Sequence, residues 1–425
     1  MLQIPRSHLL PRELDRTNRP EIELLLCCAR TQIDPTTDEH IKKLLLLDID
    51  WIYLCNLSRR HRATLLMYWN LNTSYSSEVP KAILAQLRYR YRKNLLNNLF
   101  LVQELQKLLE LLKQKEISAI PFKGPALALS AYGNIGLRWF SDLDILVRKE
   151  DFQRTKELLL SNGYRSLYDS KHEEMYFQAQ LLRHDGLVNV DLHYGIPPQH
   201  LQLNCEYFWD DLEQISIEDG LISTFSPEAH ALLLCVEGYK EPQQWLGRII
   251  DLAALIRLHQ EMNWERILAM AKGLKIEKIF YLGLLIAHKL LDVKLPPEFM
   301  EILEAGPVKR ALVSRLSRQV DDLCVEFFGE ACNIPKTPFN YSRLMEQSFY
   351  LELLDLHHLE NLAMTDRLLD RIKYFTSYAM TPTNTDRDLL SLPNSMAFLY
   401  YLFRPLRLFG NFGLRLYRRY FQLSK

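Results

Sequence analysis

The sequence lacks any apolar run long enough to cross a membrane. Uninterrupted apolar runs such as Leu44–Leu47 fall far below the roughly 18 residues that a bilayer-spanning helix needs. The segment Met1–Pro5 also lacks the basic stretch followed by an apolar stretch that marks a secretory signal. These two absences predict a cytoplasmic protein.

Paired cysteines and an excess of charge are missing as well. The seven cysteines include no C-x-x-C pair and no zinc-type spacing to histidine, so we expect most of them to be small core residues. Lys plus Arg equals Asp plus Glu at 52 each, so any attraction to nucleic acid or an anionic membrane must be local.

The hydrophobic periodicity divides the chain into three regions. With 425 residues the chain exceeds the roughly 250–300 residues of one core, and it has no internal repeat. Residues 1–116 have helical spacing, residues 117–224 mix strand and helix signals, and residues 225–425 are again helical and end in a basic tail. We therefore predict an α+β protein whose small mixed sheet is embedded between N- and C-terminal helical regions.

Short elements alternate in the first part of the α/β region, residues 117–195. Before it, residues 80–115 fit either one long helix or two. The expected elements are a strand at 117–120, a helix from Pro125 to 131, a strand at 143–147, a helix over 149–162, and two strands at 174–182 and 187–194 that turn at Asp185-Gly186.

Three aspartates in these strands form a candidate metal site. Asp142 and Asp144 lie two residues apart at the start of a strand, where alternation puts both side chains on one face. Asp191 lies on the polar face of segment 188–193 and can face the other two from the same small sheet. Three carboxylates with open coordination positions suit Mg²⁺ shared with substrate phosphates, in a site for one or two ions. The pattern therefore predicts Asp142, Asp144 and Asp191 as metal ligands.

Basic and glycine residues near this site suit a phosphate. Lys123 and Gly124 stand between the first strand and its helix, where helix N–H groups favour phosphate oxygens and Gly124 permits close backbone approach. Arg138, four residues before Asp142, is a second candidate for phosphate or for the carboxylates. We predict these three residues as nucleotide-binding.

Each motif alone has a more ordinary interpretation. A D-x-D is common on surfaces, Lys123-Gly124 alone is usually a turn, and Asp191 followed by His193 is more often an exposed polar face than a ligand set. The order of the motifs along a strand–turn–helix–strand–helix–hairpin framework favours the metal site, because independent accidents rarely fall in that sequence.

These motifs together resemble the bacterial family of uncharacterised nucleotidyltransferases, which is similar to the minimal and aminoglycoside-type members of the DNA polymerase beta superfamily. Further matches lie upstream at Asp50-Trp51 and downstream at Trp245, Arg248 and Asp251. The segments that carry the likeness in the core are 122–128, Tyr132-Gly133, Arg138, 142–147, Gly163-Tyr164 and 190–193; those near the C-terminus are 382–393 and 400–408.

The resemblance implies a polymerase beta-type core with roles for the residues above. Asp142 and Asp144 would bind the catalytic Mg²⁺, and Asp191 would be the third ligand and a possible base. Lys123 and Gly124 replace the Gly-Ser of the classical members. Glu237 stands where we expect histidine, and we assign it no role.

The leading hypothesis is a metal-dependent enzyme that transfers a nucleoside monophosphate from a nucleoside triphosphate to an unknown small-molecule, peptide or protein acceptor, releasing pyrophosphate. One alternative is a non-catalytic nucleotide-binding or antitoxin-like module of the same fold. Another is an accessory protein in peptide or polysaccharide biosynthesis. The presence of all three carboxylates favours the enzyme.

Two features outside the core have open interpretations. Arg248 and Asp251 lie three residues apart on one helix face, where a structural pair is favoured over contact with nucleotide or acceptor. After Asp388 the chain has no acidic residue and six basic ones, which could bind nucleic acid, an anionic membrane or a protein, although packing on the helical body is favoured.

Overall fold

The computed structural model describes residues 20–168, 170–196, 203, 205–217, 220–240, 245–296, 299, 396 and 399–407. The chain divides into two compact units, Met1–Phe339 and Asn340–Lys425, and each is described by itself. In the second unit a helix covers residues 400–407. Most of the basic C-terminal tail and the resemblance over 382–393 lie outside the described residues.

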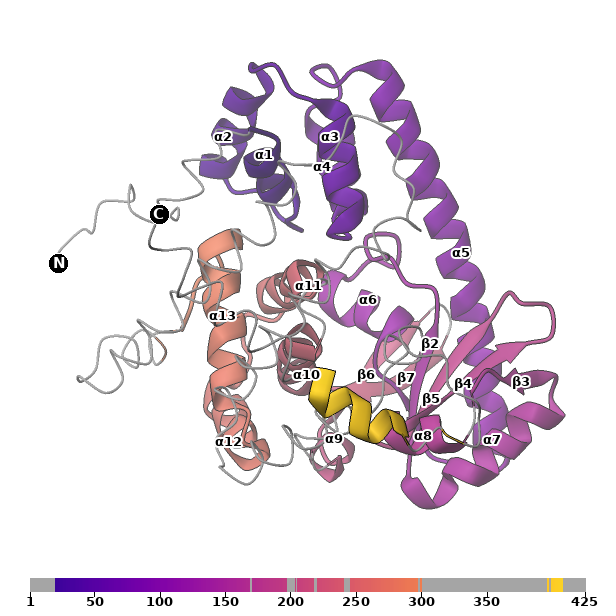
Figure 1. Cartoon of the computed structure of the whole chain (residues 1–425). Helices are drawn as coiled ribbons and strands as arrows, with labels where there is room; N and C mark the ends of the chain where they lie inside the picture. The colour runs from indigo at the N-terminus through magenta and orange to yellow at the C-terminus, as the bar shows by residue number, and fades with distance from the viewer. Residues whose placement is uncertain are drawn as a thin grey trace. The chain divides into compact units, whose positions relative to one another are not determined.

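Four short helices open the described chain (Figure 1), and an aspartate caps the start of two of them. The Asp34 carboxylate accepts the N–H groups of Thr36 and Thr37 at 3.0 Å, and Asp50 accepts the N–H of Tyr53 at 2.9 Å. Each aspartate thereby satisfies N–H groups that a helix start leaves unpaired. The four helices are α1 (Pro20–Cys28), α2 (Pro35–Leu45), α3 (Trp51–Arg60) and α4 (Thr64–Ser74).

One helix of 34 residues, α5 (Lys81–Gln114), connects these helices to the sheet. The sequence left one helix or two open, and the structure has one. Its buried residues include Leu101, Leu105, Leu108 and Leu112, which recur every three or four positions and so form a single stripe. That stripe is the part of α5 that packs under the sheet.

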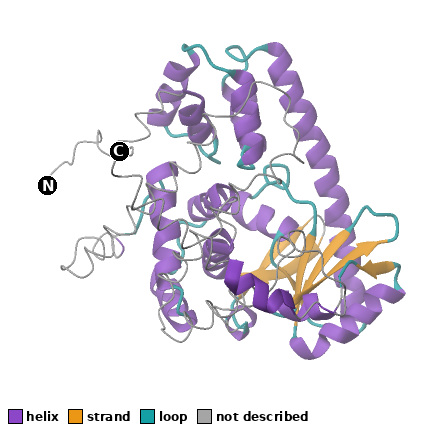
Figure 2. Cartoon of the chain, in the orientation of Figure 1, coloured by secondary structure: helices purple, strands orange, loops and turns teal. Residues whose placement is uncertain are grey.

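The central sheet has five strands in the order β1-β2-β5-β4-β3. Strands are orange in Figure 2. β2 and β5 are parallel, and the other three pairs are antiparallel. The strands are β1 (Ala119–Pro121), β2 (Leu143–Val147), β3 (Tyr164–Ser166), β4 (Gln178–Arg183) and β5 (Asn189–His193); helices α6 (Gly124–Tyr132), α7 (Phe152–Ser161) and α8 (Ser170–Tyr176) and a 3₁₀ turn at Lys149–Asp151 connect them. The prediction of an α+β protein with a small mixed sheet between helical regions is confirmed.

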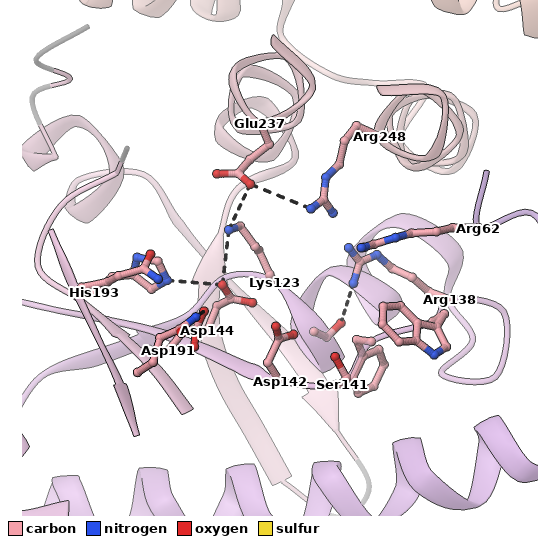
Figure 3. Close-up of a pocket in the computed structure, with 15 residues that line it drawn as sticks. Arg62, Lys123, Arg138, Ser141, Asp142, Asp144, Asp191, His193, Glu237 and Arg248 are labelled. Carbon is pink, nitrogen blue, oxygen red and sulfur yellow. Dashed lines mark hydrogen bonds and ion pairs between the residues drawn. The ribbon is translucent and has the colours of Figure 1, made fainter. Parts of the chain in front are cut away.

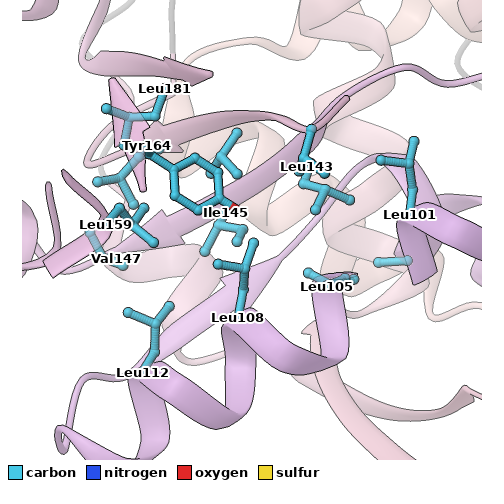
Figure 4. Packing of buried hydrophobic residues seen from close by; sticks show 14 of the residues in the cluster. Leu101, Leu105, Leu108, Leu112, Leu143, Ile145, Val147, Leu159, Tyr164 and Leu181 are labelled. Carbon is cyan, nitrogen blue, oxygen red and sulfur yellow. The ribbon is translucent and has the colours of Figure 1, made fainter. Parts of the chain in front are cut away.

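The two faces of the sheet have different chemistry because strand residues alternate. Leu143, Ile145 and Val147 of β2 point to the leucine stripe of α5 and form one apolar cluster with it (Figure 4). The residues between them, including Asp144, therefore point to the opposite face. The same alternation in β5 buries Val190 and Leu192 in the cluster and leaves Asp191 for the other face.

Two segments differ from the sequence-based prediction. The strand expected at 174–182 begins only at Gln178, because residues before it belong to α8. Glu173 of α8 is buried and accepts two hydrogen bonds from Lys156 of α7 at 2.6 and 2.7 Å, so a contact distant in sequence decides the local conformation. A hairpin of β6 (Leu212–Ile217) and β7 (Gly220–Phe225) was not predicted at all.

Four helices follow the hairpin and complete the described part of the first unit. α10 opens the region that the sequence predicted to be helical, and at its start the Ser226 hydroxyl accepts the N–H of Ala229 at 3.1 Å. In α10, His230 donates from Nε2 to the carbonyl of Phe122 at 2.8 Å, and burial lowers the pKa of this histidine to about 4. The helices are α10 (Pro227–Lys240), α11 (Trp245–Leu258), α12 (Trp264–Leu274) and α13 (Glu277–Leu291), and a short α9 (Glu206–Trp209) precedes the hairpin. None of the helices in the described ranges is both long and apolar enough to span a membrane.

Candidate active site

The parallel pairing of β2 with β5 brings two of the predicted aspartates together. Asp144 and Asp191 are direct partners in the register, although 47 positions separate them in sequence. Paired residues of neighbouring strands share a face, so both carboxylates project from the face opposite the α5 cluster. His193, two residues after Asp191, projects from the same face. One ligand atom from each of Asp144, Asp191 and His193 lies within 4.8 Å of the other two.

A pocket of about 270 Å³ opens over these residues (Figure 3). All six residues that the sequence proposed for metal or nucleotide binding line it: Lys123, Gly124, Arg138, Asp142, Asp144 and Asp191. Residues that the sequence did not assign to the site also line it, among them Arg62, Trp139, His193, Glu237 and Arg248. The sheet supplies the carboxylates, and the helical regions on both sides supply the additional charged groups.

The three carboxylates repel one another strongly. Burial, followed by the charges of Asp144 and Asp142, raises the pKa of Asp191 to about 7. Burial and the charge of Asp144 also raise the pKa of Asp142, which is half-buried and lies outside the group of Asp144, Asp191 and His193. This local excess of negative charge would be relieved by a bound cation.

Asp144 differs from its two neighbours because it already has cationic and hydrogen-bonding partners. Burial alone would raise its pKa, but Lys123 and His193 more than offset burial and hold the pKa well below its usual range. The Lys123 ammonium lies 3.2 Å from Asp144 Oδ1, and His193 Nε2 lies 3.3 Å from the same oxygen. Asp144 is therefore the carboxylate that stays ionised.

His193 is part of the site, contrary to the interpretation of Asp191 and His193 as an exposed face. Its side chain is 1% exposed and packs edge-on against Phe122, with 5.1 Å between the ring centroids. Burial lowers its pKa, so the neutral ring donates from Nε2 to Asp144. The two-residue spacing from Asp191 was the sequence signal that could have identified it.

Lys123 connects the carboxylates of the sheet to helix α10. Its ammonium lies 3.2 Å from Glu237 Oε2 as well as 3.2 Å from Asp144 Oδ1, and Figure 3 shows it between the two. The same Glu237 oxygen lies 3.9 Å from Arg248 of α11. Glu237, to which the sequence assigned no role, thus aligns two cations along one wall of the pocket.

Gly124 allows the turn after β1 to pass close to the aspartates. Its φ is +50°, and a Cβ there would lie 2.9 Å from the carbonyl oxygen of Asp142. An L side chain would be strained by that φ and would collide with backbone. The absence of a side chain therefore lets the N-terminus of α6 lie next to Asp142, the residue just before β2.

Arg138 is held in place from several sides. Its Nε lies 3.2 Å from both carboxylate oxygens of Asp251, and Asn98 of α5 donates to its carbonyl at 2.9 Å. Asp251 also accepts from the Tyr132 hydroxyl at 2.6 Å. The Arg248–Asp251 pair that the spacing suggested is long, at 3.9 Å, because Asp251 is already bound to Arg138.

The family of proteins described as uncharacterised nucleotidyltransferases matches residues 48–292, which is more than half of the chain. The chain belongs to this family. The family that the motifs of residues 122–193 resemble is thereby confirmed. A search of the curated proteins found no match.

Two solved structures have a distant likeness to the chain. The antibiotic-resistance factor ANT(2'')-Ia is 12% identical, with a TM-score of 0.30, and the match covers 41% of this chain and 90% of that one. An antigenic nucleotidyltransferase-like protein from Paracoccidioides brasiliensis is 17% identical, with a TM-score of 0.29, over 47% of this chain and 93% of that one. Likeness at this level supports no inference about substrate or activity.

Nucleotidyltransferases usually use a divalent metal, and the donor atoms of this member fit one. Asp144 and Asp191 offer hard carboxylate oxygens, which Mg²⁺ prefers, and both are more than 90% buried. Burial, followed by the charges of Asp144 and Asp142, raises the pKa of Asp191, and a bound cation would favour its ionised form. An imidazole in the same group would also admit Mn²⁺.

Lys123→Gln is expected to tighten the binding of Mg²⁺ alone and to weaken the binding of Mg²⁺ with a nucleoside triphosphate. The ammonium competes with a cation for Asp144 Oδ1, and a charge at about 4 Å is worth several kcal/mol near a protein surface, so we expect at least roughly tenfold tighter metal binding. The same ammonium would attract the triphosphate, so its removal should cost roughly tenfold in nucleotide affinity. Calorimetric titration of each ligand measures both effects.

Lys156→Gln is the matched control for this substitution. Lys156 is about as buried as Lys123 and also pairs with a buried glutamate, Glu173, but it does not line the pocket. Lys156→Gln should leave unchanged the affinity for Mg²⁺ alone and the affinity for Mg²⁺ with a nucleoside triphosphate. If Lys123→Gln weakened metal and nucleotide binding alike, Lys123 would not compete with the cation.

Proposed function

We propose that this protein is a metal-dependent nucleotidyltransferase that transfers a nucleoside monophosphate from a nucleoside triphosphate to an acceptor group and releases pyrophosphate. The observation that carries the proposal is the register of β2 and β5, which pairs Asp144 with Asp191 in a pocket that also contains Asp142. Family membership supports the transferase class. The aspartates and the basic side chains that line the pocket support the roles described below.

Asp142, Asp144 and Asp191 would hold Mg²⁺. The ion would supply charge neutralisation for the phosphates and make the acceptor hydroxyl more acidic. His193 donates to Asp144 and fixes its orientation, as outer hydrogen bonds do for ligands in metal sites. Asp191 lies in the pocket beside Asp144 and is the proposed acceptor for the proton of the attacking hydroxyl.

The basic groups of the pocket would bind the phosphates. Lys123 and the N-terminus of α6 at Gly124 lie on one side of the aspartates, and Arg138 and Arg248 line the same pocket. Binding at these groups would orient the triphosphate so that pyrophosphate leaves away from the acceptor. Arg138 is held by Asp251, so it would act from a fixed position.

A non-catalytic nucleotide-binding module is the second candidate, and one contact favours it. The Lys123 ammonium already neutralises Asp144 Oδ1, as an ion in a catalytic site would. A protein that uses lysine in place of a metal would bind the triphosphate without transferring it. The two candidates therefore differ in whether nucleotide binding needs Mg²⁺ and whether a product forms.

Transfer can be tested with nucleoside triphosphates that carry radioactive phosphorus in either the α or the γ position. The protein is incubated with each, with Mg²⁺ and with heat-treated cell extract, whose own kinases and transferases are inactive, as the source of acceptor. We expect a labelled product from the α label only, and none with Asp191→Asn. The control Asp48→Asn removes an exposed carboxylate outside the pocket and should behave like the parent protein.

Two other results of the labelling experiment would contradict transfer of a nucleoside monophosphate. A product labelled from the γ position would indicate phosphoryl transfer and overturn the proposal. Absence of product from either label, with nucleotide still bound, would favour the non-catalytic module.

A further inference from the structure

Trp139 is an exposed aromatic side chain in a pocket that is otherwise lined mainly by charged and polar groups. It retains 44% of its surface exposure, whereas Phe140 and His193, the other rings in the lining, are buried. An exposed aromatic ring in the lining of a charged pocket is a surface on which a flat ligand group can stack. Trp139 lies in the segment before β2, three residues ahead of Asp142.

Arg62, which comes from a different part of the chain, lies over the Trp139 ring. Its guanidinium carbon lies 4.9 Å from the centroid of the Trp139 ring, within the range of a cation–π contact. Arg62 also lines the pocket and comes from the turn between α3 and α4. Figure 3 shows Arg62 and Arg138 on the side of the pocket away from His193 and Asp191.

The backbone holds Arg62 in this position. Its φ is +57°, in the left-handed region that residues other than glycine rarely adopt. Gly247 of α11 packs beside it, and a Cβ there would lie at van der Waals contact, 3.6 Å from both Cβ and Cδ of Arg62. Strained conformations of this kind persist where the surroundings determine them, and they are frequent at ligand sites.

The pocket is small for a whole nucleoside triphosphate. About 270 Å³ is below the roughly 300–1,000 Å³ of pockets that enclose a drug-sized ligand. The charged lining suits a metal ion and a triphosphate. The sugar and base would then lie toward the exposed edge of the pocket, where Trp139 offers a flat apolar surface.

We propose that Trp139, held by Arg62, is the platform on which the nucleobase of the triphosphate stacks. This inference rests on the proposed function and adds the position of the base. Stacking on an aromatic ring tolerates every base because each has a flat π face. The site should therefore bind the four nucleoside triphosphates with affinities that differ by only a few-fold.

The test compares Mg²⁺–ATP with Mg²⁺–tripolyphosphate, which has the same phosphates and no base. Calorimetric titrations use the parent protein, Trp139→Ala and Trp139→Phe. We expect Trp139→Ala to lose about tenfold in affinity for ATP, a typical effect of removing a stacking ring, and nothing for tripolyphosphate. Trp139→Phe keeps a ring and should recover most of the loss.

Trp209→Ala is the matched control. Trp209 also has an arginine over its ring, with Arg148 Cζ at 4.5 Å from the centroid, but it does not line the pocket. Trp209→Ala should change neither the affinity for ATP nor the affinity for tripolyphosphate. Equal losses for ATP and tripolyphosphate in Trp139→Ala, or no loss for either, would overturn the platform and leave the proposed function intact. If the parent bound neither ligand with Mg²⁺, the proposed function would fail and the platform with it.

Discussion

Asp144→Asn and Asp191→Asn are expected to change the stability of the metal-free protein in opposite directions at pH 8. The two carboxylates are register partners and are about equally buried, at 7% and 8% exposed. Their partners differ, however, because Lys123 and His193 both contact Asp144. The substitutions therefore remove a stabilised charge in one case and a destabilised charge in the other.

Asp191→Asn should stabilise the protein. Its pKa rises from an ordinary 3.8 to about 7 in the fold, so between these values the folded protein keeps a proton that the unfolded chain has lost. The contribution of Asp191 to stability therefore falls as the pH rises through this range, and ionised Asp191 is costly at pH 8. We expect a gain of about 1–3 kcal/mol at pH 8, less than the full shift because asparagine loses some hydrogen bonding. The gain should disappear near pH 4.

Asp144→Asn should destabilise the protein. The pKa of Asp144 is lowered in the fold, so its ionised form contributes stability at every pH above its ordinary range. Removal of one member of a buried ion pair typically costs about 3–5 kcal/mol, and we expect roughly 2–4 kcal/mol because Lys123 keeps Glu237 as a partner.

Urea unfolding in the presence of EDTA, at pH 8 and at pH 5, measures both effects. Asp48→Asn serves again as the control, with no change in the unfolding midpoint. If both substitutions lowered the free energy of unfolding to the same extent, ionised Asp191 would not be unfavourable in the folded protein. Gain of stability on loss of a functional carboxylate is the trade-off that active sites commonly show.

The sequence predicted the local part of the site well. The alternation within 142–147 and 188–193 predicted which aspartates leave the core, because a strand needs only a two-residue period to separate its faces. The turn at Lys123-Gly124 was likewise predicted from residues adjacent in sequence. In the structure these segments line one pocket.

The parts that the sequence did not predict depend on contacts between distant segments. The register that pairs Asp144 with Asp191 is a property of the folded sheet. Glu237 and Arg62 reach the pocket from α10 and from the turn after α3, and no local pattern indicates that either faces the aspartates. The helix at Ser170–Tyr176 was missed for a similar reason, since the buried pair of Lys156 with Glu173 stabilises it.

The measurement that tests the central claim most directly is calorimetric titration of the four nucleoside triphosphates, with and without Mg²⁺. The titrations use the parent protein and the Asp142→Ala/Asp144→Ala variant. We expect Mg²⁺-dependent binding by the parent and a loss of at least about 100-fold in the variant, because two carboxylate ligands are removed. Circular dichroism of the variant verifies the fold. Equal Mg²⁺-dependent binding by both proteins would contradict the assignment of these aspartates to the metal site.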